Sequence, residues 1–235
     1  MSLLTDVLDD LNIKYDQEML EKTDDFYKLL IEKNKVMNLT SIIGYDDFVI
    51  KHVGDSLLSS KVFSFSDERL IDIGTGAGFP GIPLKIFFPS LEIILLDSLN
   101  KRLLFINEVI DNLSLDNIST VHGRAEDLGK DPSFRESFDL GVSRAVARLN
   151  VLSELTLPFI RTGGRFIYYK SSDIDDELFA SEKSFNILGG SDPSLIEVPL
   201  YKTDIIRNFV VVSKVRTTPK MFPRKAGTPA KDPIK

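Results

Sequence analysis

The sequence contains no cysteine and only two histidines, His52 and His122. The absence of cysteine excludes disulfides and thiol catalysis, and without H-E-x-x-H or paired histidines no metal site is expected. The sequence also lacks G-x-S-x-G, which disfavours an acyl hydrolase. No run of eighteen apolar residues could span a membrane, and the acidic N-terminus "MSLLTDVLDD" lacks the basic region of a secretory signal. We therefore expect a cytoplasmic protein without membrane or metal.

Positive charge is concentrated at the C-terminus, and the rest of the chain is acidic. The net charge is −6, yet the last 22 residues hold seven Lys or Arg and one Asp. A basic tail on an acidic body is typical of chains that contact nucleic acid or another anionic surface. Short basic termini are also common as ordinary solvated ends, so charge alone leaves both interpretations open.

The order of the predicted elements indicates an α/β fold. Residues 1–62 space their apolar residues at helical intervals and contain no strand-like run, which predicts a helical N-terminal segment that packs on the core. From residue 69 onward, strand-like runs alternate with helix-like runs, as in a doubly wound, mostly parallel sheet. The last two strands lack a helix between them, which predicts an antiparallel hairpin. The expected strands are 69–73, 91–97, 117–123, 138–144, 164–170, 194–201 and 207–215, and the expected helices are 83–88, 99–113, 146–160 and 174–187.

A glycine-rich loop, "DIGTGAGFPGIP", follows the first predicted strand and precedes a helix that Pro83 would start. Glycines allow tight turns and let a ligand approach the backbone closely. Read from Gly76, the loop matches G-x-G-x-x-G, the dinucleotide fingerprint. Read from Asp72, it matches D-x-G-x-G-x-G, which looks like the first motif of S-adenosylmethionine (SAM) methyltransferases. The loop alone does not choose between these ligands.

Two carboxylates flank this loop. Asp72 lies in an otherwise apolar strand, where a buried carboxylate needs a partner. The amine of SAM could supply that partner, and so could the loop's own backbone N–H groups. Asp97 ends the second strand, nineteen residues after Gly78. A carboxylate there can accept both ribose hydroxyls of NAD or of SAM, because both ligands contain adenosine.

Later stretches make the similarity to methyltransferases specific. "HGRAEDL" (122–128) follows the third strand, where methyltransferases carry an acidic residue that reads the adenine. "SRAVARL" (143–149) leaves the fourth strand, at the position that faces the transferred methyl group. With the glycine loop and further stretches, the sequence resembles, over nearly its whole length, the small-subunit ribosomal RNA guanine-N7 methyltransferases, formerly called glucose-inhibited division protein B. The further stretches are "NLTSI" (38–42), "HVGDSLL" (52–58), "LLDSLNKR" (95–102), "GG-F--YK" (163–170) and "PRKAGTPAKDPI" (223–234).

The resemblance implies a class I SAM-dependent methyltransferase fold, which is Rossmann-like. The methyltransferase domain would span 63–216, preceded by the helical segment 1–62 and followed by a basic tail, 217–235. Together with the loop motif, the resemblance implies SAM contacts at Asp72, Gly74, Gly76, Gly78, Phe79, Asp97, Ala125, Glu126 and Arg144. It implies RNA contacts at Asn38, His52, Arg144, Lys170, Arg207, Arg224 and Lys225.

The implied reaction is methyl transfer from SAM to N7 of a guanine in 16S ribosomal RNA, near the decoding region. Guanine N7 carries a lone pair and no proton, so it can attack the sulfonium methyl without a general base. The enzyme's work is then alignment and desolvation, which fits a sequence with no evident catalytic dyad. Because N7 must stay free, we expect Arg144 or Lys170 to bind O6 or a phosphate, with Arg144 as the positioning residue.

Two other functions remain open at this point. An NAD-dependent oxidoreductase would use the G-x-G-x-x-G match and Asp97, although a terminal hairpin and the lack of a catalytic His or Tyr–Lys arrangement weaken it. An RNA-binding protein that holds SAM without turnover is the second. The partner implied by the resemblance is 16S ribosomal RNA, within the 30S subunit or an assembly intermediate, and we expect a monomer.

Overall fold

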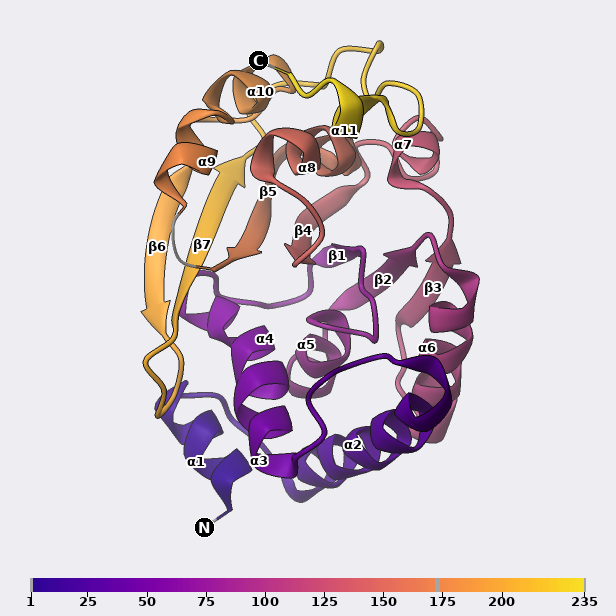
Figure 1. The fold of residues 1–235 in the computed structure, drawn as a ribbon, viewed down its shortest axis with the longest axis vertical. Helices are drawn as coiled ribbons and strands as arrows, with labels where there is room; N and C mark the ends of the chain where they lie inside the picture. The colour runs from indigo at the N-terminus through magenta and orange to yellow at the C-terminus, as the bar shows by residue number, and fades with distance from the viewer. Residues whose placement is uncertain (1, 172–173, 235) are drawn as a thin grey trace.

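A seven-stranded sheet runs through the centre of the computed structural model, which describes residues 2–171 and 174–234 (Figure 1). The strand order is β3-β2-β1-β4-β5-β7-β6, and β7 pairs antiparallel with both β5 and β6, while the other pairs are parallel. The predicted mostly parallel sheet with a terminal antiparallel hairpin is confirmed. The strands are β1 (Arg69–Ile73), β2 (Glu92–Asp97), β3 (Ile118–His122), β4 (Phe138–Arg144), β5 (Ile160–Lys170), β6 (Ser194–Pro199) and β7 (Ile206–Ser213).

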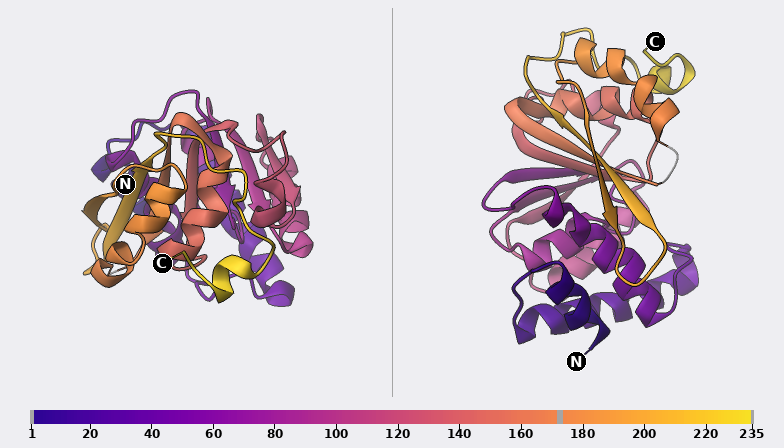
Figure 2. Two further views of the ribbon diagram at one scale, coloured as in Figure 1. Left: turned by 90° about the horizontal axis from the view of Figure 1, so that it is seen from above. Right: turned by 90° about the vertical axis from the view of Figure 1, so that its left-hand side faces the viewer.

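Helices cover both faces of the sheet and give three layers (Figure 2). Alternate residues of β1 serve the two faces, since Leu70 joins one buried cluster and Ile71 the other. The expected helix at 174–187 forms as two shorter helices, α9 and α10. The helices are α1 (Leu3–Asp10), α2 (Gln17–Met37), α3 (Tyr45–Phe48), α4 (Asp55–Leu57), α5 (Gly81–Phe87), α6 (Asn100–Asn112), α7 (Ala125–Leu128), α8 (Leu149–Thr156), α9 (Asp175–Phe179), α10 (Glu182–Ile187) and α11 (Thr228–Lys231).

The N-terminal helices pack against the glycine loop rather than forming a separate body. The Asp16 side chain accepts a hydrogen bond from the backbone N–H of Met19 and so starts α2. Phe26 of α2 and Phe48 of α3 are buried, and their rings contact Phe79 of the loop. Between α3 and α4, residues 49–54 form a π-helical turn, a conformation frequent at functional sites. This turn directs His52 toward the carboxyl ends of the strands.

The basic C-terminal tail folds back onto the sheet's second face. Its residues 217–234 are described, and α11 lies beside α8 and α7 (Figure 1). Phe222 and Ile234 are buried in the same cluster as Leu152 of α8. The tail is therefore a packed part of the fold.

The strand order creates a switch point beside β1. The chain passes from β1 to β2 on one side and returns to β4 on the other, so the loops after β1 and β4 diverge. In open α/β sheets, ligands bind in the crevice at the carboxyl ends of the strands at such a point. No helix within the described residues is long and apolar enough to cross a membrane.

Candidate active site

A pocket of about 400 Å³ opens at the carboxyl ends of β1, β2 and β4. We call it the glycine-loop pocket. It has a size typical of small-molecule sites. Four of the predicted SAM contacts line it, namely Gly74, Asp97, Ala125 and Glu126. Val146 and the tail residues Gly227 and Ala230 complete its wall.

Asp97 stands at the floor of this pocket with both carboxylate oxygens oriented by backbone donors. Oδ2 accepts a hydrogen bond from the Gly76 N–H at 3.0 Å, and Oδ1 accepts one from the Leu99 N–H at 2.8 Å. Arg102 lies 3.4 Å from Oδ2. Arg102 donates a second bond to Oδ2 from Nη1. Oδ1 keeps a further lone pair for a ligand hydroxyl, and a hydroxyl at Oδ2 would take the place of the long bond from Arg102.

Glu126 also lines the pocket, lies in the first turn of α7 and is almost fully buried. Its Oε1 accepts a hydrogen bond from the backbone N–H of Gly227 at 2.9 Å. Its Oε2 lies 3.7 Å from Nε of Arg124. A carboxylate from one loop is thus positioned by a backbone amide of the C-terminal tail.

The glycines of the loop have distinct reasons to lack a side chain. Gly74, Gly76 and Gly78 all have positive φ, a region that L side chains rarely adopt. A Cβ on Gly74 would lie 2.5 Å from Cγ2 of Val146, at the wall of the pocket. A Cβ on Gly76 would meet open space, its nearest neighbour being 4.0 Å away. Gly76 requires glycine for its backbone conformation alone, whereas Gly74 requires it for both its conformation and the lack of space for a Cβ.

Asp72 lies beneath the loop and does not line the pocket. Its Oδ2 accepts a hydrogen bond from the Gly81 N–H at 3.0 Å, so the loop backbone is the partner that the structure supplies. Its Oδ1 has no hydrogen-bond partner within the described residues. Full burial raises the pKa of Asp72 to about 7. The geometry gives no direct route for the expected contact with the SAM amine.

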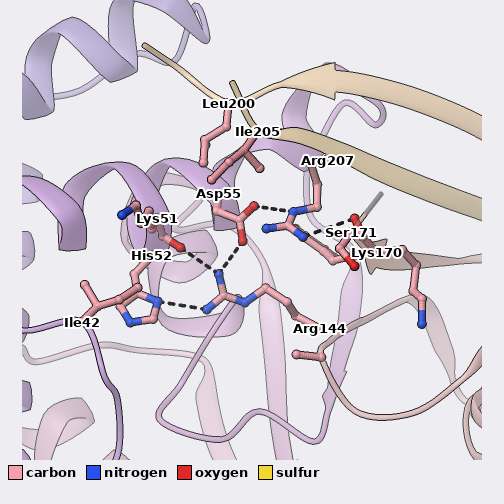
Figure 3. Close-up of a pocket in the computed structure, with 12 residues that line it drawn as sticks. Ile42, Lys51, His52, Asp55, Arg144, Lys170, Ser171, Leu200, Ile205 and Arg207 are labelled. Carbon is pink, nitrogen blue, oxygen red and sulfur yellow. Dashed lines mark hydrogen bonds and ion pairs between the residues drawn. The ribbon is translucent and has the colours of Figure 1, made fainter. Parts of the chain in front are cut away.

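A second pocket, also of about 410 Å³, lies on the other side of the β4 end (Figure 3). We call it the arginine pocket. At its centre Asp55, which is 1% exposed, holds two arginines. Its Oδ2 lies 2.6 Å from Nη1 of Arg144, and its Oδ1 lies 2.6 Å from Nε of Arg207. Charge-assisted bonds of this length fix both guanidinium groups in place.

His52 connects the arginine pocket to the glycine loop. Its ring stacks on Phe79, with centroids 4.2 Å apart and planes 11° from parallel. Its Nδ1 lies 3.2 Å from Nη2 of Arg144, and its Nε2 lies 2.8 Å from the hydroxyl of Thr40. An arginine can only donate, so Nδ1 is the acceptor and Nε2 carries the proton. Burial, and then the charge of Arg144, lower the pKa of His52 to about 4.

The side chains of the remaining predicted RNA contacts do not pair with Asp55, Arg144 or His52. Asn38 is an exposed left-handed residue that ends α2. Lys170 lines the arginine pocket, but its ammonium points away from Asp55, toward Glu177 at 2.7 Å and the Ala147 carbonyl at 3.0 Å (Figure 3). Lys225 is exposed in the tail.

Arg224 has a different partner from the one expected. Its guanidinium pairs with the buried carboxylate of Glu154 at 2.7 Å, which neutralises its charge inside the fold. The geometry therefore does not support the expected RNA contact of Arg224. Two more basic residues of the C-terminal stretch also have internal contacts. Lys214 is buried against Glu136, and Arg216 donates to Asn186.

Ala145 lines both pockets. It follows Arg144 at the end of β4 and has a φ of +58°, so the chain turns sharply between the two cavities. A ligand in the glycine-loop pocket and a group in the arginine pocket would therefore approach each other at this residue. In the described parts of the chain, no cluster of three His, Cys, Asp or Glu is arranged to hold a metal ion.

Sequence reasoning missed two parts of this site. Asp55 lies within "HVGDSLL", and a lone acidic residue in that apolar helical run was the available signal. Gly227 lies within "PRKAGTPAKDPI", where the basic residues indicate an anionic partner and no sequence signal marks the backbone amide.

Comparisons with known proteins give one consistent result. The family model described as "rRNA small subunit methyltransferase G" (GidB) matches residues 19–203. The "Ribosomal RNA small subunit methyltransferase G" of Lachnoclostridium phytofermentans is 47% identical over 95% of this chain and 93% of its own length. The protein of the same name from Clostridium beijerinckii is 44% identical over 99% and 98%.

Solved structures agree at the level of the fold. A methyltransferase from Pyrococcus furiosus superposes with a TM-score of 0.56 at 16% identity, covering 80% of this chain and 95% of that one. A predicted O-methyltransferase from Agrobacterium tumefaciens gives 0.55 at 18% identity, covering 70% and 83%. The sheet order and these neighbours confirm the class I SAM-dependent methyltransferase fold. The chain belongs to the family of ribosomal RNA small subunit methyltransferases G.

Proposed function

We propose that this protein transfers the methyl group of SAM to N7 of a guanine in 16S ribosomal RNA. The observation that carries the proposal is the pair of pockets that adjoin at Ala145. One has the features of an adenosine site, and the other presents fixed positive charge. Family membership supports a SAM-dependent ribosomal RNA methyltransferase and sets the NAD-dependent alternative aside.

The residues of the glycine-loop pocket fit SAM. Asp97 would accept the ribose hydroxyls, and Ala125 and Glu126 would bound the adenine. Gly74 leaves open the space at the wall that a Cβ would share with Val146. When bound there, SAM supplies an electrophilic methyl group on its sulfonium.

The arginine pocket orients the base without exchanging a proton. Guanine N7 forms the new bond to the methyl carbon as the carbon–sulfur bond breaks, so no general base is needed. His52 stays neutral at physiological pH, in keeping with this. The Arg144 guanidinium is held by Asp55, His52 and the Lys51 carbonyl, and its remaining N–H groups can bind guanine O6 or a phosphate. Lys170 is less suited to this role because Glu177 already pairs with it.

The setting of the reaction is part of the proposal. The target base would be unpaired or splayed out, because sequence-specific RNA readers favour unstacked bases. We propose that the protein acts in the cytoplasm as a monomer, on the 30S subunit or an assembly intermediate. Exposed lysines of the tail, such as Lys220 and Lys225, would contact phosphates.

Transfer of labelled methyl from SAM to 30S subunits and to stripped 16S RNA tests the activity, and mapping of N7-methylguanine tests the site. Arg144→Ala should abolish transfer while the protein stays folded, whereas the surface variant Arg161→Ala should keep it. Full activity of Arg144→Ala would overturn the assigned role. SAM binding without transfer to either substrate would favour the non-catalytic alternative, and NADH binding without SAM binding would favour the oxidoreductase.

A further inference from the structure

The C-terminal tail reaches the glycine-loop pocket from the far side of the molecule. It passes beside α7, returns over α8 through α11 and ends near α10, and residues 224–232 form a turn that contains α11 (Figure 1). This turn lies beyond residues 19–203, the part of the chain that the family model matches. Gly227 and Ala230 of the turn line the pocket. No role in cofactor binding follows from the sequence of this stretch.

A buried ion pair holds the turn against α8. The Arg224 guanidinium meets the Glu154 carboxylate through two donors, Nε to Oε1 at 3.0 Å and Nη2 to Oε2 at 2.7 Å. The backbone N–H of Arg224 adds a third bond to Oε1 at 2.7 Å. Glu154 is 0% exposed, and the positive charge of Arg224 offsets the cost of burying its carboxylate. Such fork-to-carboxylate pairing fixes direction as well as distance.

The same arginine also fixes the other end of the turn. Its Nη2 donates to the backbone carbonyl of Asp232 at 2.7 Å. Residues 224 and 232 are thereby held by one side chain, and the backbone between them has little freedom. Arg224 thus determines where the amide of Gly227 lies.

The Gly227 amide points at a carboxylate of the pocket. It donates to Oε1 of Glu126 at 2.9 Å, and Gly227 itself has a φ of +80°. Glu126 is otherwise bounded by Arg124, 3.7 Å from its Oε2. The position of Glu126 is therefore set by a contact that exists only while the tail is folded.

We propose that Gly227 and Ala230, in the turn from Arg224 to Asp232, form a wall of the SAM site, and that Arg224 is a positioning residue for SAM binding. Arg224 acts through the Gly227 amide on Glu126 and touches neither SAM nor RNA. The inference rests on the proposed function, because it assumes that the glycine-loop pocket holds SAM. It gives the basic residue at position 224 an internal role that its charge alone did not suggest.

Calorimetry with SAM and with S-adenosylhomocysteine tests this directly. Arg224→Gln removes the fork and should raise the Kd for both ligands at least tenfold, and Arg224→Lys should recover part of the loss. The matched control is Lys231→Gln, an exposed residue of the same turn, which should leave both Kd values unchanged. Steady-state assays should show a raised KM for SAM with the KM for RNA within twofold of wild type. A purely stabilising role would not separate the two constants.

A measurement on the unmodified protein covers the case in which Arg224→Gln does not fold. Amide hydrogen exchange of residues 224–232 should slow when S-adenosylhomocysteine binds, because the ligand stabilises the wall it contacts. Unchanged exchange there, or wild-type affinity in folded Arg224→Gln, would overturn the tail's role while leaving the methyltransferase proposal intact. Failure of wild-type protein to bind either ligand would instead overturn the proposed function.

Discussion

In the glycine-loop pocket the carboxylates are oriented by backbone amides, whereas in the arginine pocket a buried carboxylate is paired with arginine side chains from distant segments. Gly74, Ala125 and Val146 bound the first, and its two carboxylates are oriented by backbone amides. In the second, Asp55 meets arginines that lie 89 and 152 positions further along the chain. Ala145 is common to both.

The two pockets differ in the interactions that maintain their shape. Backbone amides and absent side chains give the glycine-loop pocket a shape that depends on conformation at a few positions. Buried charges give the arginine pocket a shape that depends on their mutual compensation, because an unpaired buried charge is costly. We therefore expect the first pocket to fail through steric change and the second through loss of a single charge.

The largest effect should come from Asp55→Ala, which leaves Arg144 and Arg207 without their shared carboxylate. Removing one partner of a buried ion pair costs about 3–5 kcal/mol of unfolding free energy. Methyl transfer should also be lost, since neither guanidinium would keep its position. Urea unfolding measures the first effect and the labelled-methyl assay measures the second.

Two variants calibrate that result. Glu92→Ala removes an exposed partner of Arg69, and such surface pairs are worth about 0–1 kcal/mol. Asp55→Asn keeps the shape but removes the charge, and its loss should approach that of Asp55→Ala. If Asp55→Ala were no more destabilising than Glu92→Ala, the arginine pocket would not depend on charge compensation, and the contrast between the pockets would fail.

The next effect should come from Gly74→Ala in the glycine-loop pocket. Left-handed backbone costs a non-glycine residue about 1–2 kcal/mol, and the new Cβ would also displace Val146, which lines the pocket. Gly76→Ala carries similar backbone strain at φ +64° but meets open space. SAM affinity, measured by calorimetry, should therefore fall about tenfold further in Gly74→Ala than in Gly76→Ala. Equal losses would show that space at Val146 is unimportant.

The same contrast explains which parts of the fold and of the site could be predicted from the sequence. The mostly parallel sheet and its terminal hairpin follow from periodicity and from the missing last crossover, which are local properties of the chain, whereas the spatial order of the strands came from the structure. Within one pocket, Gly74, Asp97, Ala125 and Glu126 were predictable because each lies at the end of a strand or the start of a helix. A parallel sheet brings all such positions to one edge.

The rest depended on tertiary contacts that no spacing encodes. The pairing of Asp55 with Arg144 and Arg207 requires the N-terminal segment to dock beside β4 and β7. The pairing of Arg224 with Glu154 turns an apparent RNA-binding residue into an internal one. Asp72 was expected to have a partner, and the structure shows that this partner is the Gly81 amide. Charge in a sequence predicts a partner without saying whether it is internal.

A smaller effect is the pH dependence of stability, which we expect to come from His52 in the arginine pocket. The folded-state pKa of His52 is about 4, below its ordinary value of 6.5, so the unfolded state binds a proton that the folded state does not. Stability should therefore fall as pH is lowered from 6.5 toward 4, with a contribution of at most about 1.4 kcal/mol per pH unit. Arg144 disfavours and Asp55 favours the protonated ring.

His52→Asn provides the check, because the amide oxygen can accept from Arg144 but does not titrate. Urea unfolding at several pH values should show a shallower slope for this variant between pH 6.5 and 4. A wild-type slope in His52→Asn would mean that His52 is not the group that couples the arginine pocket to pH.

The smallest effect should come from the exposed lysines of the tail, which belong to neither pocket. Lys220→Gln and Lys225→Gln each remove one charge without a buried partner. If each lysine contacts a phosphate, RNA affinity should fall modestly and the slope of log K against log salt should decrease by about 1 per variant. SAM affinity should stay unchanged, in contrast to the loss expected for Arg224→Gln.

Single substitutions are needed to test the lysines. Deletion of residues 217–235 would also remove the wall formed by Gly227, so it cannot separate RNA binding from SAM binding. A change in SAM affinity without a change in the salt slope would place both lysines with the glycine-loop pocket rather than at the RNA surface.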